Sequence, residues 1–407
     1  MKKKLAIAVV GTFDSKAEEH CFLKDRIEQK GIRVLTINVG TKGPSPSPVS
    51  IDLYELMHQK KSLKYESRDE AIDAMIREAR KKIRQLCENG KICGIISAGG
   101  GTGTHLCTRI MHELPLGFPK IMISTVASRD MTNIVGTKDI AMIHSVADLL
   151  GVNSISGIIL DKAAAGICGM VKSNWSPEEE KKRIALPFFG FITEGAEATK
   201  EALEDLGYEV VAFHANGTGG MAMEELATEG YFDGILDLAT HELADDLKDG
   251  YCGGIGPERF QPVKGKAIPR LVVPGGLDCA VLEFTRHNIP DQYKDRKIFF
   301  YDFRSAIRLD ADETTILADQ LAEKLNLNPT NIKVLIPTKG WSEADREGRP
   351  LYDPDMNRLF TQSLKQLLNP QIKIQEVEHH INDAVFGEIA AKVMDEMVRN
   401  VNIGEIL

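Results

Sequence analysis

LAIAVVGTFDSKAEEHCFLKDRIEQKGIRVLTINVG (residues 5–40) decides the fold class, because it holds a strand, a helix and a second strand in succession. Residues 5–10 are a continuous apolar run, as a buried parallel strand requires. Residues 15–30 are charged with apolar residues at helical spacing, and Gly31 suits the end of that helix. Residues 34–39 form the next strand, and TKGPSPSPVS (41–50) predicts an exposed loop.

The same order of features returns in the second half of the chain. IALPFFGFITEGAEATKEALEDLGYEVVAFHANG (184–217) repeats the strand, glycine, helix, glycine and strand of residues 5–40. Further on, CGIISAGGGTGT (93–104) parallels DGILDLATHELA (233–244), and PKIMIST (119–125) parallels PRLVVPG (269–275). We interpret this as an internal duplication, with convergent α/β patterning as the alternative.

Alternating strands and helices with continuous apolar strands predict doubly wound parallel sheets. The expected architecture is α/β, with two Rossmann-like domains and a cleft between them. The boundary falls in the polar, charged stretch from 172 to 182. We expect a nucleotide-binding domain over residues 1–178 and a second α/β domain over residues 179–407.

Charge and cysteine content narrow the class of protein. The 407 residues carry a formal net charge of −9, which argues against a broad nucleic-acid surface. The seven cysteines are scattered without a C-x-x-C pair, which is typical of reduced cysteines in a cytosol. No apolar stretch looks long enough to span a bilayer. We therefore expect a cytoplasmic protein that binds neither nucleic acid nor membrane.

Three turns of the first half follow strands, so they should meet at one edge of its sheet, where doubly wound folds bind ligands. In GGGTGT (99–104), glycines permit positive φ and close approach of an anion, and the next helix start offers free N–H groups. We therefore expect a phosphate cradle there. The expected cofactor contacts are Gly11, Thr12, Asp14, Ser15, Gly99, Gly100, Gly101, Thr102, Gly103, Thr104, Ser124, Thr125, Ala127 and Ser128.

The glycine turn alone does not specify a ligand. It is neither G-x-x-x-x-G-K-[ST] nor G-x-G-x-x-G, and a turn that serves only tight packing remains the alternative. Asp14 is open in the same way. It could cap the first helix, or it could contact a ribose hydroxyl or Mg²⁺.

The second half supplies polar residues at or near its strand ends. Lys339 could pair with a phosphate or carboxylate, or be a solvated lysine; HHIND (379–383) could supply a general base, or surface and capping residues. His241, Glu242 and Asp245 fall near one helical face, but H-E-x-x-H is absent and no metal site is assigned. The catalytic candidates are His214, Glu242, Asp278, Lys339, His380 and Asp383.

Eight stretches together resemble a known family: GTFDSKAEE (11–19), ISAGGGTGT (96–104), LPLGFPKIMISTVAS (114–128), FHANGTGGMAMEEL (213–226), PGGLD (274–278), PTKGWSEAD (337–345), YDP (352–354) and HINDAVF (380–386). The chain resembles the ATP-binding domain family of the plant tobamovirus (tomato mosaic virus) resistance protein and its bacterial relatives. The resemblance implies a two-domain Rossmann-like fold, ATP and Mg²⁺ bound mainly in the N-terminal half, and self-association as a homodimer or larger homo-oligomer. In plants the domain is fused to a TIM barrel, so a separate barrel protein is an expected partner by analogy.

Three functions follow as hypotheses. The first is an ATP-binding protein, acting on a small metabolite in the interdomain cleft together with the barrel partner; whether it is an enzyme, and of which reaction, stays open. The second is a nucleotide-regulated interaction module without turnover. The third is a two-lobed binder of a non-nucleotide small molecule.

Overall fold

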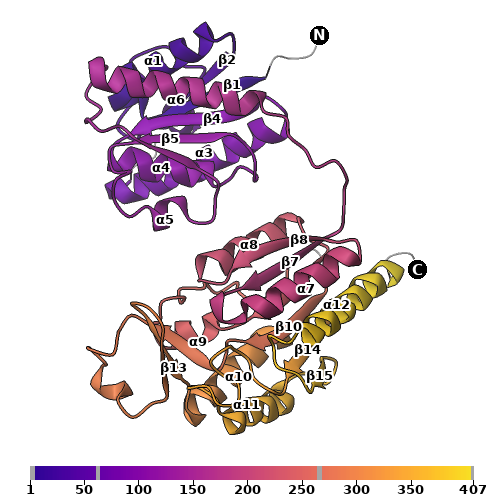
Figure 1. Ribbon diagram of the computed structural model, residues 1–407. Helices are drawn as coiled ribbons and strands as arrows, with labels where there is room; N and C mark the ends of the chain where they lie inside the picture. Colours follow the sequence, from indigo (N-terminus) through magenta and orange to yellow (C-terminus); the bar gives the residue numbers. More distant parts are fainter. Residues whose placement is uncertain (1–4, 61–64, 264–267, 405–407) are drawn as a thin grey trace. The chain divides into compact units, whose positions relative to one another are not determined.

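The computed structural model describes residues 5–60, 65–263 and 268–404. The chain divides into two compact units, Met1–Ser176 and Pro177–Leu407 (Figure 1). Each unit contains a six-stranded parallel sheet with helices on both faces. The predicted α/β class with two Rossmann-like sheets is thereby confirmed.

The sheet of the first unit has the strand order β3-β2-β1-β4-β5-β6, and every neighbouring pair is parallel. All six residues of β1 are buried, which explains the continuous apolar run from which this strand was predicted. The strands are β1 (Ala6–Gly11), β2 (Arg33–Asn38), β3 (Ile51–Asp52), β4 (Ile92–Gly99), β5 (Lys120–Ser124) and β6 (Ala141–His144).

Helices cover both faces of this sheet, because side chains of a strand alternate between its faces. Ile7 and Val9 of β1 pack with α1 and α6, whereas Ala8 and Val10 pack with α3 and α4 on the opposite face (Figure 1). The helices of this unit are α1 (Phe13–Gln29), α2 (Leu53–Lys60), α3 (Arg68–Glu88), α4 (Gly101–Met111), α5 (Thr132–Val135) and α6 (Ser154–Lys172).

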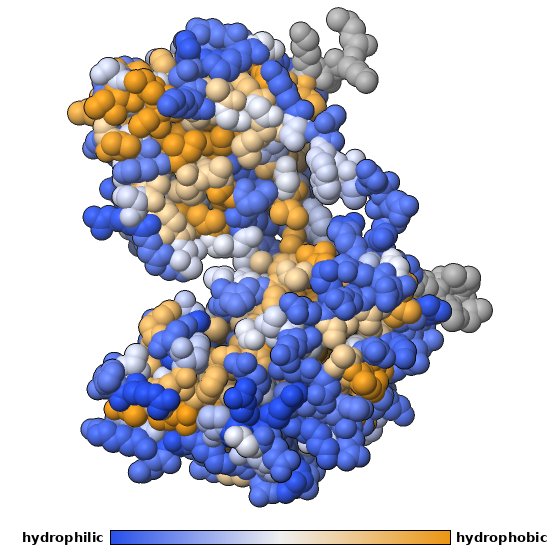
Figure 2. All heavy atoms as spheres, in the orientation of Figure 1, coloured by the Kyte–Doolittle hydropathy of each residue, from blue (hydrophilic) through white to orange (hydrophobic). Residues whose placement is uncertain are grey.

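Helix α6 corrects one expectation from the sequence. Its 19 residues are long and apolar enough, by length and composition, to cross a membrane, although no such stretch was expected. Leu160, Ala163 and Ile167 of this helix are buried in the core of the first unit. Ile155 and Ile158 on its other side are exposed, and Figure 2 shows apolar side chains gathered over this part of the unit. The apolar residues on the inner side of α6 are therefore explained by its packing against the sheet of the first unit.

The sheet of the second unit has the order β15-β14-β10-β9-β7-β8, again with all neighbours parallel. Counted along the chain, the second, first, third, fourth and fifth strands are adjacent in that order. The first unit shows the same order once its two-residue edge strand β3 is set aside. This shared order supports the duplication. The strands are β7 (Arg183–Phe188), β8 (Glu209–His214), β9 (Gly234–Ala239), β10 (Arg270–Gly275), β14 (Ile332–Pro337) and β15 (Lys373–Val377).

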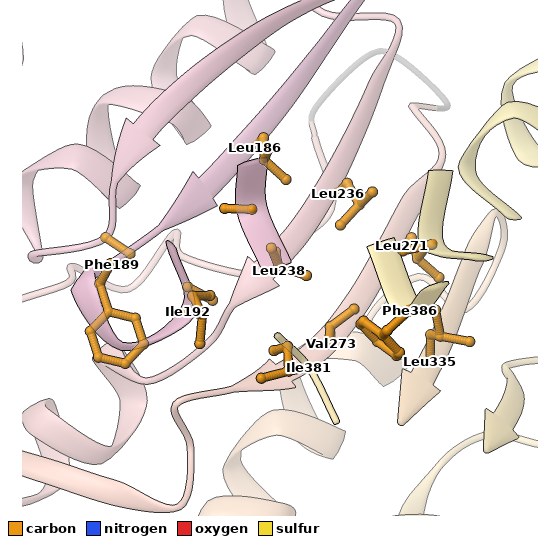
Figure 3. Packing of buried hydrophobic residues seen from close by; sticks show 14 of the residues in the cluster. Leu186, Phe189, Ile192, Leu236, Leu238, Leu271, Val273, Leu335, Ile381 and Phe386 are labelled. Atoms are coloured by element: carbon orange, nitrogen blue, oxygen red, sulfur yellow. The ribbon is translucent and has the colours of Figure 1, made fainter. Parts of the chain in front are cut away.

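Two layers of helices also enclose the second sheet. Leu186, Leu238 and Val273 pack with α7 and α12 on one face, where Figure 3 shows Val273 beside Phe386. On the other face the strands pack with α8, α10 and α11. The helices are α7 (Thr193–Asp205), α8 (Thr218–Glu229), α9 (Glu242–Leu247), α10 (Ala311–Asn326), α11 (Pro354–Leu367) and α12 (Ala384–Gly404), with short 3-10 turns at Gly190–Ile192 and Asp291–Tyr293.

A small antiparallel sheet between β10 and α10 has no counterpart in the sequence prediction. Its order is β11-β13-β12. Because β11 is fully buried and only four residues long, it gives no alternating pattern that would announce an antiparallel strand. Its strands are β11 (Cys279–Leu282), β12 (Ile298–Phe300) and β13 (Ser305–Arg308).

Candidate functional site

The first sheet reverses its winding direction between β1 and β4. The connections after these two neighbouring strands run to opposite faces, which leaves a crevice at their carboxyl ends. A pocket of about 210 Å³ lies at this point. Its lining comes from Thr12 and the first turn of α1, from the loop after β2, from the start of α3 and from α4 with its N-cap. The lining residues are Thr12, Asp14, Ser15, Lys16, Thr41, Lys42, Arg68, Gly100, Gly101, Thr102, Gly103 and Leu106.

The start of α4 forms the floor of this pocket with backbone rather than side chains. Gly100 is the N-cap residue and offers no side-chain hydrogen bond to the first turn. The first N–H groups of a helix have no partner within it, so those of α4 are left for a ligand. A Cβ atom at Gly101 or Gly103 would meet nothing within 4 Å. The helix dipole adds about 0.3–1 kcal/mol for an anion at such a position.

The glycines of this turn act differently from the expectation. None of residues 99–103 has positive φ, so the turn does not need glycine for backbone freedom. Glycine is needed in this turn because it has no side chain. A Cβ at Gly99 would lie 3.0 Å from the Cα of Gly103, so the absent side chain lets α4 start directly against the end of β4.

Three cationic side chains line the same pocket. Lys16 follows β1 and bonds the carbonyl of Leu149, Lys42 lies in the loop after β2, and Arg68 begins α3. The Arg68 guanidinium donates to Thr102 Oγ1 at 3.2 Å, which holds its charge beside the start of α4. Three cations, one carboxylate and bare amides together favour a polyanionic ligand.

Asp14 is not the cap of the first helix, so that alternative is wrong. Helix α1 begins at Phe13 with Thr12 as N-cap, and the N–H of Phe13 donates instead to Asn38 Oδ1 on β2 at 3.1 Å. Asp14 Oδ2 accepts from the backbone N–H of Lys42 at 2.8 Å. A Cβ at Gly40 would lie 2.2 Å from the Asp14 carboxyl carbon, so only glycine lets this loop close on Asp14.

Seven of the fourteen nominated residues line the pocket, and the others lie behind or beside it. Thr104 and Ser124 are fully buried and share a hydrogen bond of 2.7 Å that joins α4 to β5. Gly11 faces the ring of His20, which a Cβ would approach to 1.8 Å. The nominated residues outside the lining are Gly11, Gly99, Thr104, Ser124, Thr125, Ala127 and Ser128.

Sequence reasoning did not nominate five of the pocket residues: Thr41, Lys42, Arg68, Lys16 and Leu106. The first two follow β2 and could have been found, because β2 ends at the same sheet edge as β1. Arg68 gave no local signal, since it begins a helix far along the chain. A larger hollow of about 740 Å³ lies along α2 and α3, and its lining includes aliphatic and charged side chains with Tyr65 and Gln85 but no glycine.

The equivalent place in the second unit is occupied by two buried aromatic rings. Phe189 follows β7 and His241 follows β9, the pair of strands that correspond to β1 and β4. Their rings stack with centroids 3.7 Å apart, and both side chains are buried. Aromatic packing therefore fills the position where the first unit has its pocket.

Glu242 belongs to a buried ion network rather than to an open site. Its Oε2 lies 2.9 Å from Nε of Arg259, and its Oε1 accepts from the N–H of Gly217 at 2.7 Å. Arg259 also reaches Glu224 at 3.1 Å and Asp237 at 2.7 Å. The network joins α8, β9 and the start of α9, so its contacts are structural.

Asp278 lies in a second buried polar cluster, after β10. Ser342 Oγ donates to Asp278 Oδ2 at 2.9 Å, and Arg308 lies 3.1 Å from Asp345. Burial, followed by repulsion from Asp345, raises the pKa of Asp278 to about 7. Its Oδ1 is buried without a hydrogen-bond partner.

Because the pKa of Asp278 is raised, the free energy of unfolding should depend on pH through this residue. A carboxyl group with a higher pKa in the folded than in the unfolded state stabilises the fold at acid pH and loses this contribution as pH rises through its folded pKa. We expect the stability of Asp278→Asn relative to the parent chain to rise between about pH 4 and 7, the interval between the unfolded and the folded pKa of Asp278. Urea unfolding across this range measures the difference. The exposed Asp291→Asn variant is the control, and a parallel shift in both variants would contradict the assignment.

His380 and Asp383 bind groups of the fold, as expected for capping residues and not for a general base. His380 Nε2 lies 3.0 Å from the Ser342 carbonyl oxygen, and Nδ1 lies 3.1 Å from the N–H of Asn382 and 3.0 Å from Arg346 Nη2. Asp383 accepts from the His380 N–H at 2.9 Å. Burial lowers the pKa of His380, so its neutral form uses both ring nitrogens inside the fold.

Of the remaining candidates, Lys339 is exposed and pairs with Glu378 at 3.0 Å, and His214 is exposed at the end of β8.

The fold and the pocket together define a class: two-unit α/β proteins with Rossmann-like sheets and a polar, glycine-floored pocket at the winding reversal of the first sheet. The chain belongs to the uncharacterised protein family UPF0261. The N-terminal domain of that family matches residues 5–176, and its C-terminal domain matches residues 181–398.

Relatives in bacteria and in tomato confirm the resemblance. A UPF0261 protein of Clostridium tetani is 36% identical over 98% of this chain and 100% of its own length. The ToMV resistance protein Tm-1(GCR237) of Solanum lycopersicum is 31% identical over 93% of this chain, which spans 54% of the tomato protein. Among solved structures, Acinetobacter baumannii MurG aligns with 97% of this chain and 99% of its own at 12% identity, with a TM-score of 0.24. A likeness this low says nothing about ligand or reaction.

Proposed function

We propose that this protein binds ATP with Mg²⁺ in the pocket of its first unit. The observation that carries the proposal is the bare start of α4 at the winding reversal, faced by Lys16, Lys42 and Arg68. Phosphate groups are bound at helix starts of this kind in doubly wound folds. The first unit therefore offers the nucleotide both amide donors and compensating positive charge.

The same pocket has oxygen groups suited to a hydrated magnesium ion. Asp14 is half-buried, and its carboxylate lies beside the hydroxyl of Ser15, which donates to it at 3.1 Å. Mg²⁺ in nucleotide sites usually keeps several waters and takes one or two carboxylates together with phosphate oxygens. Asp14 would hold the ion in this way, and the ion would neutralise part of the phosphate charge.

Arg68 provides the sharpest test of the charge complement. We expect Arg68→Ala to weaken ATP binding about 10- to 100-fold, because a hydrogen bond to a charged group is worth about 1.5–3 kcal/mol. Isothermal titration calorimetry of the full chain with Mg-ATP measures the loss. Lys200→Ala removes an exposed cation from the second unit and serves as the control. Equal affinity of Arg68→Ala and the parent chain would contradict this role.

The choice of phosphate ligand separates the proposed function from its alternatives. ATP should bind more tightly than ADP and AMP, and saturation at about 100 times Kd should stabilise the fold by about 2.7 kcal/mol. An interaction module would bind ATP equally well but release no phosphate, with or without its partner. If no phosphorylated ligand produces heat or a thermal shift, the pocket belongs to a different class of molecule.

We further propose a cytoplasmic homo-oligomer with a barrel-containing partner. All seven cysteines are free thiols, as a reducing compartment would keep them. Almost half of the tomato relative lies outside the part that this chain spans, and a separate protein could supply that remainder. The exposed apolar residues Leu150, Ile155 and Ile158 offer a surface for self-association. Light scattering of the purified chain, alone and with candidate partners, tests both proposals.

A further inference from the structure

Three residues with metal-binding side chains meet inside the second unit. His241 follows β9, Asp245 lies four residues later on α9, and Cys252 lies in the next loop. One ligand atom from each lies within 4.8 Å of the other two, and all three residues are buried. Four-residue spacing on a helix places His241 and Asp245 on one face, and the backbone N–H of Cys252 donates to Asp245 Oδ2 at 2.8 Å.

The imidazole of His241 is an unsatisfied polar group. The residue is fully buried, and neither ring nitrogen has a hydrogen-bond partner. One ring face stacks on Phe189, which fixes the plane of the imidazole without satisfying its nitrogens. Leaving a buried donor or acceptor unpaired costs about 1–3 kcal/mol. Buried polar groups in native folds nearly always have a partner, and a metal ion bound through a ring nitrogen would provide one for His241.

Binding of a cation at these side chains is coupled to the release of protons. A coordinating cysteine binds as its thiolate and a coordinating histidine as its neutral ring. The thiol proton of Cys252 would therefore pass to solvent when the ion binds, and the His241 ring nitrogen and the Asp245 carboxylate would complete the set of ligand atoms.

The surrounding charge suits a dication. The neighbouring network holds three buried carboxylates, from Glu224, Asp237 and Glu242, against two guanidinium groups, from Arg259 and Arg270. The network therefore holds more carboxylates than guanidinium groups, and burial raises the pKa of Glu242. Because burying unpaired charge is costly, an added dication would relieve the network as well as bind to its ligands.

We propose that His241, Asp245 and Cys252 form a binding site for one Zn²⁺ ion. Nitrogen, sulfur and oxygen are the ligand types that zinc takes, and three protein ligands leave one tetrahedral position for water or a substrate.

The loop that carries Cys252 is rich in glycine. It contains Gly250, Gly253, Gly254 and Gly256, of which the last two have positive φ. Cys252 is 5% exposed, whereas the other two ligands are fully buried. Of the three ligands, Cys252 therefore lies nearest to solvent.

Cobalt provides a direct test on the full-length chain. The chain is purified without metal-affinity chromatography, stripped with a chelator and titrated with Co²⁺ and, in competition with a chromophoric chelator, with Zn²⁺. We expect one ion per chain, visible bands of tetrahedral Co²⁺, and a near-ultraviolet thiolate-to-cobalt transition. Cys252→Ser should abolish that transition and weaken Zn²⁺ binding by more than the 10- to 100-fold that loss of an outer-sphere partner causes. Cys279→Ser, at another buried cysteine of the same unit, should bind as the parent chain does.

Two results would overturn the site. The first is a stripped parent chain that takes up no stoichiometric Zn²⁺ or Co²⁺. The second is a cobalt complex without the thiolate transition, or one that Cys252→Ser leaves unchanged. If Cys252→Ser does not fold by circular dichroism, Asp245→Asn replaces it, and undiminished Zn²⁺ affinity in that variant contradicts the assignment equally. ATP binding in the first unit is measured separately, so the two proposals fail independently.

Discussion

Gly101→Val is expected to abolish ATP binding while the chain still folds. A Cβ at this position meets nothing within 4 Å, so the fold has room for the side chain. Gly101 lines a pocket of only about 210 Å³, and a branched side chain there would occupy the place of the phosphate and shield the bare N–H groups. Calorimetry with Mg-ATP should show no binding heat, and thermal unfolding without nucleotide should match that of the parent chain.

Gly169→Val supplies the matched control. Gly169 is also an exposed helical glycine whose Cβ would meet nothing within 4 Å, but it lies on α6 and outside the pocket lining. This variant should bind ATP with parental affinity. Normal ATP binding by folded Gly101→Val would show that the nucleotide does not use the start of α4.

Arg259→Met is expected to destabilise the second unit by about 3–5 kcal/mol, because it leaves buried carboxylates without their partner. Arg259 is fully buried and pairs with Glu224, Asp237 and Glu242 at 2.7–3.1 Å. Arg270 still pairs with the first two at 2.6 and 2.8 Å, but Glu242 would keep only its hydrogen bond from Gly217. Whole domains are stable by only about 5–15 kcal/mol, so this loss is a large fraction.

Differential scanning calorimetry measures the effect as a fall in the unfolding temperature of the second unit of about 6–20 °C. Arg358→Met is the control, since Arg358 is 65% exposed and pairs with Asp355 at the surface. Exposed pairs of this kind contribute about 0–1 kcal/mol. An Arg259→Met chain as stable as Arg358→Met would mean that the network contributes packing rather than charge compensation.

Local pattern was sufficient to locate the pocket but not to assign its side chains. The glycine turn and the residues after β1 could be placed at one sheet edge, because parallel strands bring their carboxyl ends together. Lys42 and Arg68 were missed, since each reaches the pocket from another loop or helix. The Asp14 cap was wrong because Asn38, on the neighbouring strand, satisfies the first N–H of α1 in place of a local side chain.

The second unit shows the same limit more strongly. Its strand ends could be located from the repeat, yet Glu242, His380 and Asp383 turned out to have partners within the fold. Phe189 and His241 give no sequence signal that they stack, because they are 52 positions apart and come together only through strand pairing. Cys252 likewise has no spacing motif in common with His241 and Asp245.

The α/β class, the two similar halves and the glycine turn could be predicted from local sequence, because burial on both sheet faces and helical periodicity depend on neighbouring residues. The tertiary structure alone decided which polar groups are free to bind a ligand. A side chain is free only when no distant residue satisfies it, and contacts such as Asn38 with Phe13 or Arg259 with Glu224 depend on the packing of whole elements.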